Sequence, residues 1–249
     1  MTSQWTNRFV HHLVDVVVIV ALVFGITTGI AGIWAWQRFG EWPTDLNTSD
    51  VDTWVVALIV LIQNVALIGF VWWRGRTDIV VGWRFDRLAV VYTLVGVPLL
   101  FAVNVIIGAV FAILDLRQNQ VASYPLQAGD VTGQLLFGFA AAVIAPLGEE
   151  IVFRGYWLQR LQGWWGSTIA IVASSLLFAV AHSWSATEGA GVLVTQTLVM
   201  GVILAWLRLA SGSIWPAVFA HAANNALAIS VLMICLNNPE LGCAVAGES

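Results

Sequence analysis

Three short polar strings interrupt apolar segments in the second half of the chain, and their residue types suit proton transfer. A charged side chain at the centre of a membrane helix costs about 2.5–3.5 kcal/mol on insertion scales, so such residues mark functional sites by default. The strings hold two acids with an arginine, a lone histidine, and a histidine with an asparagine: Glu149, Glu150 and Arg154; His182; His221 and Asn225.

The two adjacent acids of the first string are expected to play different parts. Glu150 and Arg154 are four residues apart, so on a helix they share one face and can pair. Glu149 is rotated by about 100° from Glu150 and is left available for other work. An ion pair that snorkels at the cytoplasmic end of its helix is the alternative. Pro146 and Gly148, which loosen the backbone beside the two acids, leave both interpretations open.

The histidines and the asparagine also admit a structural interpretation when each is taken alone. His182 could be a hydrogen-bonded helix contact, and His221 with Asn225 on one face could be an interhelical polar clasp. Taken together with Glu149, they supply what hydrolysis of an acyl bond requires. A carboxylate can take a proton from water, while neutral histidine and asparagine can donate hydrogen bonds to an oxyanion.

The composition indicates which elements must position these side chains. Of 249 residues, 59% are hydrophobic and only 10% are charged, and the mean hydropathy is +0.86. Soluble domains carry about 25% charged residues, so lipid must be the solvent for much of this chain. We predict an all-α, polytopic transmembrane helical bundle of about seven spanning helices with an intramembrane catalytic cavity, the spans being 13–36, 53–73, 88–114, 131–153, 166–184, 190–209 and 213–236.

These spans divide the chain into three parts. Residues 1–130 hold the first three transmembrane helices with their loops, 131–236 form the catalytic core of helices four to seven, and 237–249 form a short tail. Two cysteines, Cys235 and Cys243, could form one bridge, but two unpaired thiols are the favoured interpretation.

The arginines indicate the orientation. With seven crossings, eight of the ten fall on one side and only Arg38 and Arg117 on the other. The eight are Arg8, Arg74, Arg76, Arg84, Arg87, Arg154, Arg160 and Arg208. Basic residues gather on the cytoplasmic side, so we expect an integral protein of the plasma membrane with its N-terminus cytoplasmic and its C-terminus outside. The net charge of −4 and the lack of a basic stripe argue against nucleic acid as a partner.

The three strings resemble the motifs of the CAAX protease and bacteriocin-processing family of intramembrane glutamic endopeptidases. The family pattern is EExxxR, then FxxxH, then HxxxN. Here the same pattern reads Glu149-Glu150 with Arg154, Phe178 with His182, and His221 with Asn225, in order and with intact spacing. The resemblance covers about residues 131–230. The well-known members have about eight spans, so one span fewer here leaves substrate entry less defined.

The resemblance implies a role for each matched residue. Glu149 would be the general base that activates water, and His182 would help to hold or activate that water. His221 and Asn225 would stabilise the oxyanion of the tetrahedral intermediate. Glu150 and Arg154 would support them, and we interpret Phe178 as a packing position.

The simple helix boundaries do not bring the three strings to one depth. At 1.5 Å per residue, Glu149 would lie near the cytoplasmic face, His182 roughly 24 Å from it and His221 about 12 Å from it. Either the fourth helix begins later and runs longer, or residues 164–167 are interfacial and the fifth helix begins deeper. We predict a conical, water-filled cavity that reaches these groups. A separation of more than about 10 Å between Glu149 and His182 would exclude the site.

Two other hypotheses remain. Glutamate and two histidines can form a catalytic zinc site, so a zinc-dependent membrane protease with the same residues as ligands is the alternative to an enzyme without a cofactor. A non-catalytic scaffold, an immunity-type protein or a transporter subunit belongs to another class. For the enzyme we expect a peptide or membrane-anchored protein substrate and the lipid bilayer as partners; the sequence predicts no particular oligomeric state.

Overall fold

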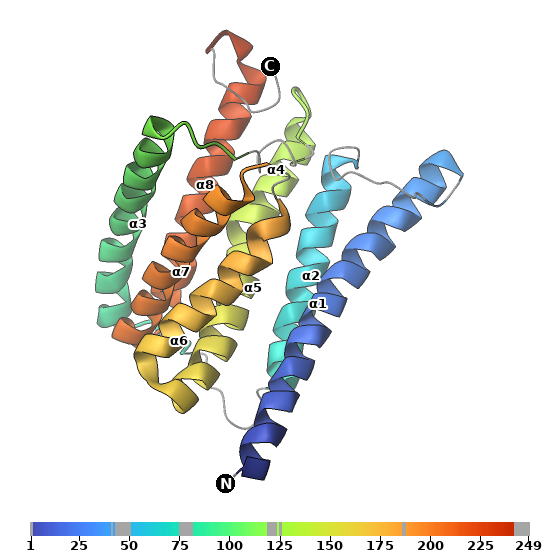
Figure 1. Ribbon diagram of the computed structural model, residues 1–249. Coiled ribbons are helices and arrows are strands. Elements are labelled where there is room, and N and C mark those ends of the chain that lie inside the picture. The colour runs from blue at the N-terminus through green and yellow to red at the C-terminus, as the bar shows by residue number, and fades with distance from the viewer. Residues whose placement is uncertain are drawn as a thin grey trace.

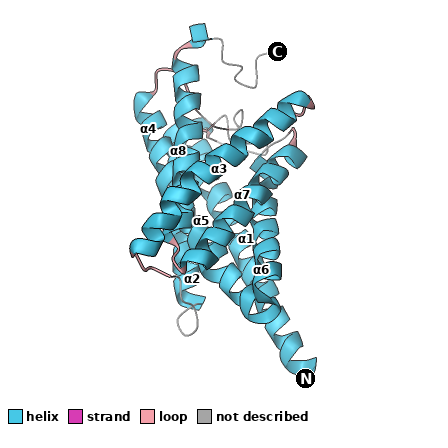
Figure 2. Cartoon of the chain, turned by 90° about the vertical axis from the view of Figure 1, so that its left-hand side faces the viewer, coloured by secondary structure: helices cyan, strands magenta, loops and turns pink. Residues whose placement is uncertain are grey.

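The computed structural model describes residues 2–40, 42, 51–74, 82–118, 124, 126–185 and 188–241, and all elements in these ranges are helices (Figures 1 and 2). Two of them, η3 and η4, are π-helical, and η5 and η6 are 3₁₀ turns. In chain order they are α1 (Thr2–Phe39), α2 (Thr53–Arg74), α3 (Arg87–Ile113), α4 (Val131–Phe139), η3 (Ala140–Ile144), α5 (Ala145–Glu150), η4 (Ile151–Trp157), α6 (Leu158–His182), η5 (Ser183–Ser185), α7 (Ala190–Ser211), α8 (Trp215–Asn237) and η6 (Pro239–Leu241).

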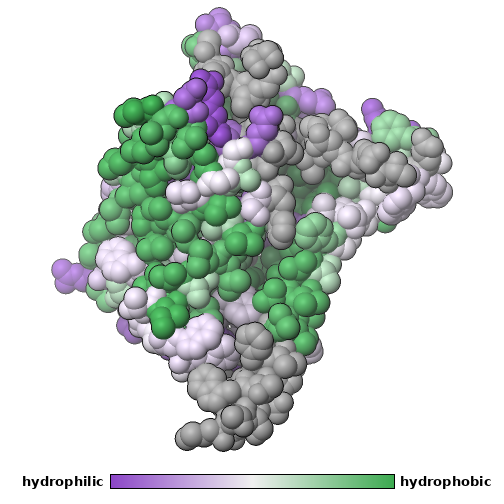
Figure 3. All heavy atoms as spheres, in the orientation of Figure 1, coloured by the Kyte–Doolittle hydropathy of each residue, from purple (hydrophilic) through white to green (hydrophobic). Residues whose placement is uncertain are grey.

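The bundle has the character of a membrane protein, as predicted. Six helical runs in the described ranges are long and apolar enough to cross a bilayer. Large apolar side chains face outward, and α3 exposes Val105 by 72% and Ile113 by 83%. Figure 3 shows hydrophobic residues gathered over the face that α3, α6 and α7 present. This apolar surface requires lipid around it.

One of the six runs contains two crossings, which agrees with the predicted number of about seven. The run Val131–His182 is 52 residues long. It turns at Gly166, where φ is +76° and ψ is 173°. A positive φ is readily adopted only by glycine, so Gly166 permits a sharp reversal without a loop. After the turn, α6 packs back against η4 (Figure 1).

This turn corrects the predicted end of the fourth span at residue 153. The first of the two crossings continues through η4 to Gly166, and its side chains Tyr156, Leu158 and Leu161 are buried in the core. The predicted boundary was wrong because a charged residue such as Arg154 is typical of the end of an apolar span. Its charge is buried and compensated within the bundle, so it marks no edge.

The same turn resolves the mismatch in depth. Glu149 lies about 17 residues before Gly166 and His182 about 16 residues after it, which corresponds to roughly 25 and 24 Å of helix. The two side chains therefore reach the same level. The turn extends further toward the N-terminal end of the bundle than the link between α7 and α8 (Figure 1). His221, which lies only about 9 Å into α8, can thus meet both of them.

A buried polar cluster joins α1 to η4, the helix that follows the two glutamates. The Asp15 side chain is 1% exposed. It accepts a hydrogen bond from Arg74 Nε at 2.7 Å and one from the Tyr156 hydroxyl at 2.5 Å. Sequence analysis did not single out these residues. Because α1 and α2 lie outside the catalytic core in sequence, this polar contact adds to the apolar packing of Phe70 and Val71 that joins them to η4.

The interpretation of the cysteines as unpaired thiols was wrong. Cys235, near the end of α8, is disulfide-bonded. The other cysteine of the chain, Cys243, and most of the predicted tail lie outside the described residues.

Gly148, which precedes the catalytic acids, is needed for close packing on α2. A Cβ atom there would lie 2.1 Å from Asn64 Oδ1. Asn64 is 5% exposed, and its Nδ2 donates to the Val60 carbonyl at 2.9 Å, so it has little room to move. We expect Gly148→Ala to lower the free energy of unfolding by about 1–3 kcal/mol, the usual cost of overpacking. Thermal unfolding in detergent measures this change.

Two further variants test the cause of that loss. Asn64→Ala in the Gly148→Ala background should recover most of the lost stability by removing the clash. Gly163→Ala is the matched control, because a Cβ at Gly163 meets nothing within 4 Å. If the Gly163 and Gly148 variants unfold at the same temperature, close approach of α2 is not the reason for the glycine.

Candidate active site

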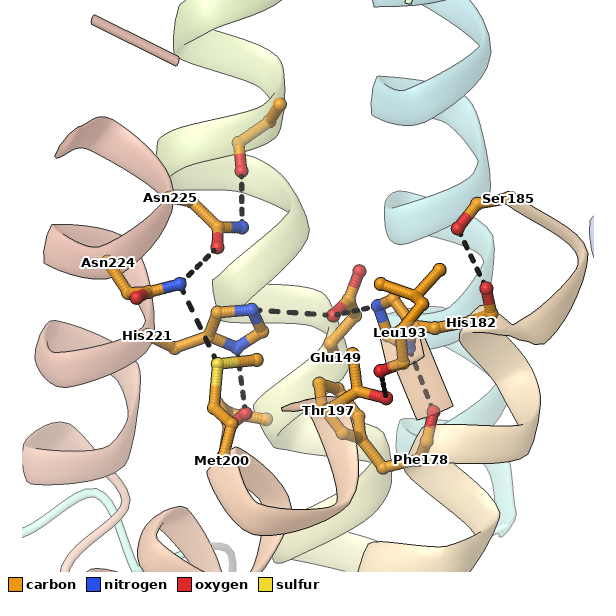
Figure 4. Close-up of polar contacts among 12 residues, drawn as sticks. Glu149, Phe178, His182, Ser185, Leu193, Thr197, Met200, His221, Asn224 and Asn225 are labelled. Carbon is orange, nitrogen blue, oxygen red and sulfur yellow. Dashed lines mark hydrogen bonds and ion pairs between the residues drawn. The ribbon is translucent and has the colours of Figure 1, made fainter. Parts of the chain in front are cut away.

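The structure brings the three polar strings together inside the bundle (Figure 4). Glu149 comes from α5, His182 from the last turn of α6, and His221 from the second turn of α8. Glu149 Oε2 lies 3.7 Å from the Nε2 atom of His182 and 3.7 Å from the Nε2 atom of His221. These separations are far below the limit of about 10 Å that would have excluded a shared site.

The Glu149 side chain is partly exposed, but its Oε2 atom, which faces the two imidazoles, is buried. Its side chain and that of His182 are each 22% exposed, whereas that of His221 is 2% exposed. Glu149 Oε2 has no hydrogen-bond partner in the part of the chain that the structure describes. A separation of 3.7 Å is too long for a direct hydrogen bond but is typical of groups that share a bridging water. The shape of the predicted cavity stays a prediction.

Glu150 and Arg154 make the expected contact, at 3.0 Å between Oε1 and Nη1, and both side chains are fully buried. The same Oε1 atom also lies 3.0 Å from Nδ1 of His221. This second contact was not predicted, because no sequence spacing relates residues on different helices. Glu150 thus holds the imidazole of His221 as well as the guanidinium of Arg154.

These hydrogen bonds determine which nitrogen of each imidazole carries a proton. His182 Nδ1 lies 2.8 Å from the Phe178 carbonyl, which can only accept, so this nitrogen is the donor. Glu150 Oε1 accepts from the Arg154 guanidinium, and as an acceptor it makes His221 Nδ1 a donor too. In their neutral forms both histidines therefore direct an Nε2 lone pair toward Glu149. Three acceptors that converge on one region favour a proton donor, a cation or an extra proton there.

Phe178 has a larger part than the packing position predicted for it. The ring is fully buried, with its centroid 4.4 Å from the Arg154 guanidinium carbon. It lies 4.4 Å from the ring of His182, in a tilted arrangement, and 5.7 Å from that of His221, edge to face. One aromatic ring therefore fixes the orientation of both imidazoles and covers the buried cation.

Asn225 is held by a defect in the helix that precedes Glu149. In the π-turn η3, the Ala145 N–H bonds to the Ala140 carbonyl. Pro146 has no N–H, so the Ala141 carbonyl loses both donors that a helix would offer it. Asn225 Nδ2 donates to this carbonyl at 3.0 Å. The backbone next to Pro146 thus orients the amide of Asn225, and the second N–H of that amide is left for another acceptor.

Tyr124, in the connection between α3 and α4, lies near this group. Its ring is 5.3 Å from that of Phe137. Burial, with a smaller contribution from the negative charge of Glu149, raises the pKa of Tyr124 to about 12. The hydroxyl therefore stays protonated and can only stabilise negative charge as a neutral donor. No motif pointed to this residue.

The donor set of Glu149, His182 and His221 is chemically suited to zinc, as the alternative hypothesis supposed. With bonds of 2.0–2.1 Å, tetrahedral ligands lie about 3.4 Å apart, so separations of 3.7 Å would have to contract slightly. Within the described ranges, no three such side chains are arranged to hold a metal ion as they stand.

An apolar cavity of about 400 Å³ lies elsewhere, between α1 and α6. Leu13 and Val16 line one side, and Leu161, Leu177 and Val180 line the other. None of the candidate catalytic residues lines it, so it is separate from the site.

Comparison with known proteins agrees with the resemblance seen in the motifs. Residues 131–227 match the family described as type II CAAX prenyl endopeptidase Rce1-like. The matched segment contains all three polar strings, and it confirms the family suggested by their spacing. No curated protein and no solved structure matches the chain.

Proposed function

We propose that this integral membrane protein, whose residues 131–227 match the Rce1-like endopeptidase family, hydrolyses a peptide bond within the membrane by means of a glutamate-activated water. The family match supports an intramembrane protease in general. The observation that carries the mechanism is the position of Glu149 Oε2 between two imidazole Nε2 atoms. The substrate is a peptide or a membrane-anchored protein.

In the first step, Glu149 removes a proton from a bound water. His182 Nε2 accepts the second hydrogen of that water and so orients its oxygen lone pair. The oxygen attacks the carbonyl carbon of the substrate, and the electron pair of the C=O double bond moves onto the carbonyl oxygen. General-base assistance of this kind contributes about 10²–10⁴ to the rate.

His221 and Asn225 stabilise the resulting oxyanion. Because Nδ1 of His221 is already a donor to Glu150, His221 must be protonated for Nε2 to donate as well. The charges then balance: Arg154 and His221 are positive, and Glu149 and Glu150 are negative. Buried charges are stable only when they are compensated in this way.

In the second step, the tetrahedral intermediate collapses. The C–N bond breaks, its electron pair goes to the nitrogen, and Glu149 returns the proton to the leaving amine. The products are a carboxylic acid and an amine, and the site regains its starting protonation. Neither step needs a metal ion or another cofactor.

The experiment that tests this proposal is cleavage of a library of membrane-anchored peptides by the purified protein in proteoliposomes, with mass spectrometry of the products. His221→Ala and Asn225→Ala should each lower kcat by about 10²–10³, as removal of other oxyanion donors does. If both variants cleave at the wild-type rate, the oxyanion assignment is wrong. If the wild-type protein cleaves no member of the library, the proposed activity is contradicted.

Removal of divalent metals distinguishes the proposal from the zinc alternative. We expect the wild-type protein to keep its full rate of cleavage after prolonged treatment with a chelator and gel filtration. Loss of cleavage that zinc alone restores would instead assign Glu149, His182 and His221 as metal ligands.

The proposed orientation has the N-terminus in the cytoplasm and the C-terminus outside, in the plasma membrane. Arg154 is buried in the bundle and is therefore not counted as a cytoplasmic arginine. Seven arginines then remain on the predicted cytoplasmic side and two on the opposite side. α8, whose last turns hold the disulfide-bonded Cys235, ends on the side of the bundle opposite the N-terminus (Figure 1). Disulfides persist outside reducing compartments. Both observations support the same orientation.

A further inference from the structure

A chain of side-chain amides runs from α3 to the candidate oxyanion donor. Asn104 Nδ2 donates to Asn224 Oδ1 at 2.5 Å. Asn224 Nδ2 donates to Asn225 Oδ1 at 3.4 Å and to Met200 Sδ at 3.7 Å. The amide of Asn224 thus uses its oxygen and both of its N–H groups (Figure 4 shows the part around Asn224 and Asn225).

The direction of this chain is determined at its far end. The Ala141 carbonyl can only accept, so Asn225 must direct its NH₂ group toward it. Asn225 then directs its oxygen toward Asn224, which must donate to it from its own NH₂ group. The oxygen of Asn224 in turn requires a donor, and Asn104 provides it. Each amide therefore has one orientation that satisfies all of its neighbours.

From this we infer that Asn104 is a positioning residue, which acts through Asn224 to hold the N–H of Asn225 toward the oxyanion. The inference rests on the proposed function. Asn104 lies on α3, outside the matched segment 131–227, so the family motifs do not include it. Without Asn104 the oxygen of Asn224 loses its donor, and the Asn224 amide is then free to rotate away from Asn225 Oδ1. The Asn225 amide keeps only its contact with the Ala141 carbonyl, so its second N–H is held less firmly toward the oxyanion.

A purely structural clasp between α3 and α8 would show itself differently. Such a clasp would affect stability, and a general loosening of the bundle would change KM as well as kcat. A positioning residue lowers kcat alone, and its effect disappears when the side chain that it positions is absent.

The first experiment measures whether the chain of amides exists, and it needs no substrate. Thermal unfolding is recorded in detergent for the wild type, Asn104→Ala, Asn224→Ala and the double variant. We expect the double variant to unfold about 2–4 °C above the value that the two single shifts predict, since both single variants break the same hydrogen bond. Additive shifts would overturn the inference whether or not the protein is a protease.

The second experiment measures positioning in the cleavage assay. Asn104→Ala should lower kcat about tenfold with KM unchanged. In the Asn225→Ala background the same change should alter kcat by no more than about twofold. The inference would be overturned if Asn104→Ala lowered kcat by the same factor in the wild type and in the Asn225→Ala background. It would also be overturned if Asn104→Ala raised KM and left kcat unchanged. If the unfolding temperatures are coupled but the wild type cleaves nothing, the amide chain stands and the proposed function fails.

Gln134→Ala is the matched control. Gln134 is also a buried amide that joins two helices, donating to the Gln127 carbonyl at 2.7 Å and accepting from Asn237 at 2.8 Å. It lies in α4, remote from the candidate catalytic groups. We expect this variant to unfold at a lower temperature and to keep the wild-type kcat. If it loses kcat as Asn104→Ala does, loosened packing explains both effects and Asn104 has no positioning role.

Discussion

Glu149→Gln is expected to lower kcat for peptide cleavage by about 10²–10⁴ while substrate binding is retained. The change preserves the size of the side chain and removes only its ability to take a proton. Glu149 Oε2 is the carboxylate oxygen between the two imidazoles. Glu150 cannot replace it because its side chain is fully buried and paired with Arg154 and His221. The measurement is single-turnover cleavage in proteoliposomes, with substrate affinity determined separately.

Glu240→Gln provides the control for that experiment. It makes the same chemical change at an exposed acid in η6, and we expect wild-type cleavage. Equal cleavage by the Glu149 variant and the wild type would defeat the glutamate mechanism. An unchanged kcat with a raised KM would show that Glu149 binds substrate but does not act as a base.

Glu150→Ala is expected to reduce the free energy of unfolding by about 3–5 kcal/mol. This is the usual cost of removing one partner of a buried ion pair and leaving the other charge uncompensated. Arg154 is fully buried, and among the described residues its guanidinium would keep the Gly201 carbonyl at 3.3 Å and the rings of Phe153 and Phe178 as partners, with no carboxylate bonded to it. The same variant should also lose cleavage, since His221 would lose the carboxylate that accepts from its Nδ1 and would keep only Glu149, at 3.7 Å, beside its protonated form. Denaturation in mild detergent and the cleavage assay measure the two effects.

A double variant separates the two roles of Glu150. Glu150→Leu with Arg154→Met replaces the buried pair by apolar side chains of similar size, which is often close to neutral for stability. We expect the double variant to fold about as stably as the wild type and to remain inactive. An active double variant would show that Glu150 serves stability alone.

Much of the fold and the contents of the candidate site followed from the sequence. Lipid-facing helices could be predicted from hydropathy because every residue of a span contributes to the signal. Glu149, His182 and His221 were found because each is costly in an apolar helix. Their roles stay predictions, and the observed separations of 3.7 Å are the part that the structure adds.

The features that sequence analysis missed are those that depend on contacts between helices. A single glycine, Gly166, reverses the chain without the polar loop that usually marks the end of a span. The bond between Glu150 and His221 joins residues 71 positions apart, and that between Asn104 and Asn224 joins residues 120 apart. The prediction placed Arg154 outside its span for a related reason. Hydropathy cannot distinguish a buried charge that is paired with an opposite charge from an exposed one.

The missing N–H of Pro146 has a consequence for transplanting this site into another protein. The amide of Asn225 is oriented by the Ala141 carbonyl, and that carbonyl is available because the preceding helix is irregular at this point. The first and third motifs are therefore linked through a backbone irregularity that neither motif contains. A designer who copies the glutamates, histidines and asparagine onto regular helices would reproduce every side chain and leave the amide without its anchor. The smallest portable unit of this site includes the proline and the π-turn before it.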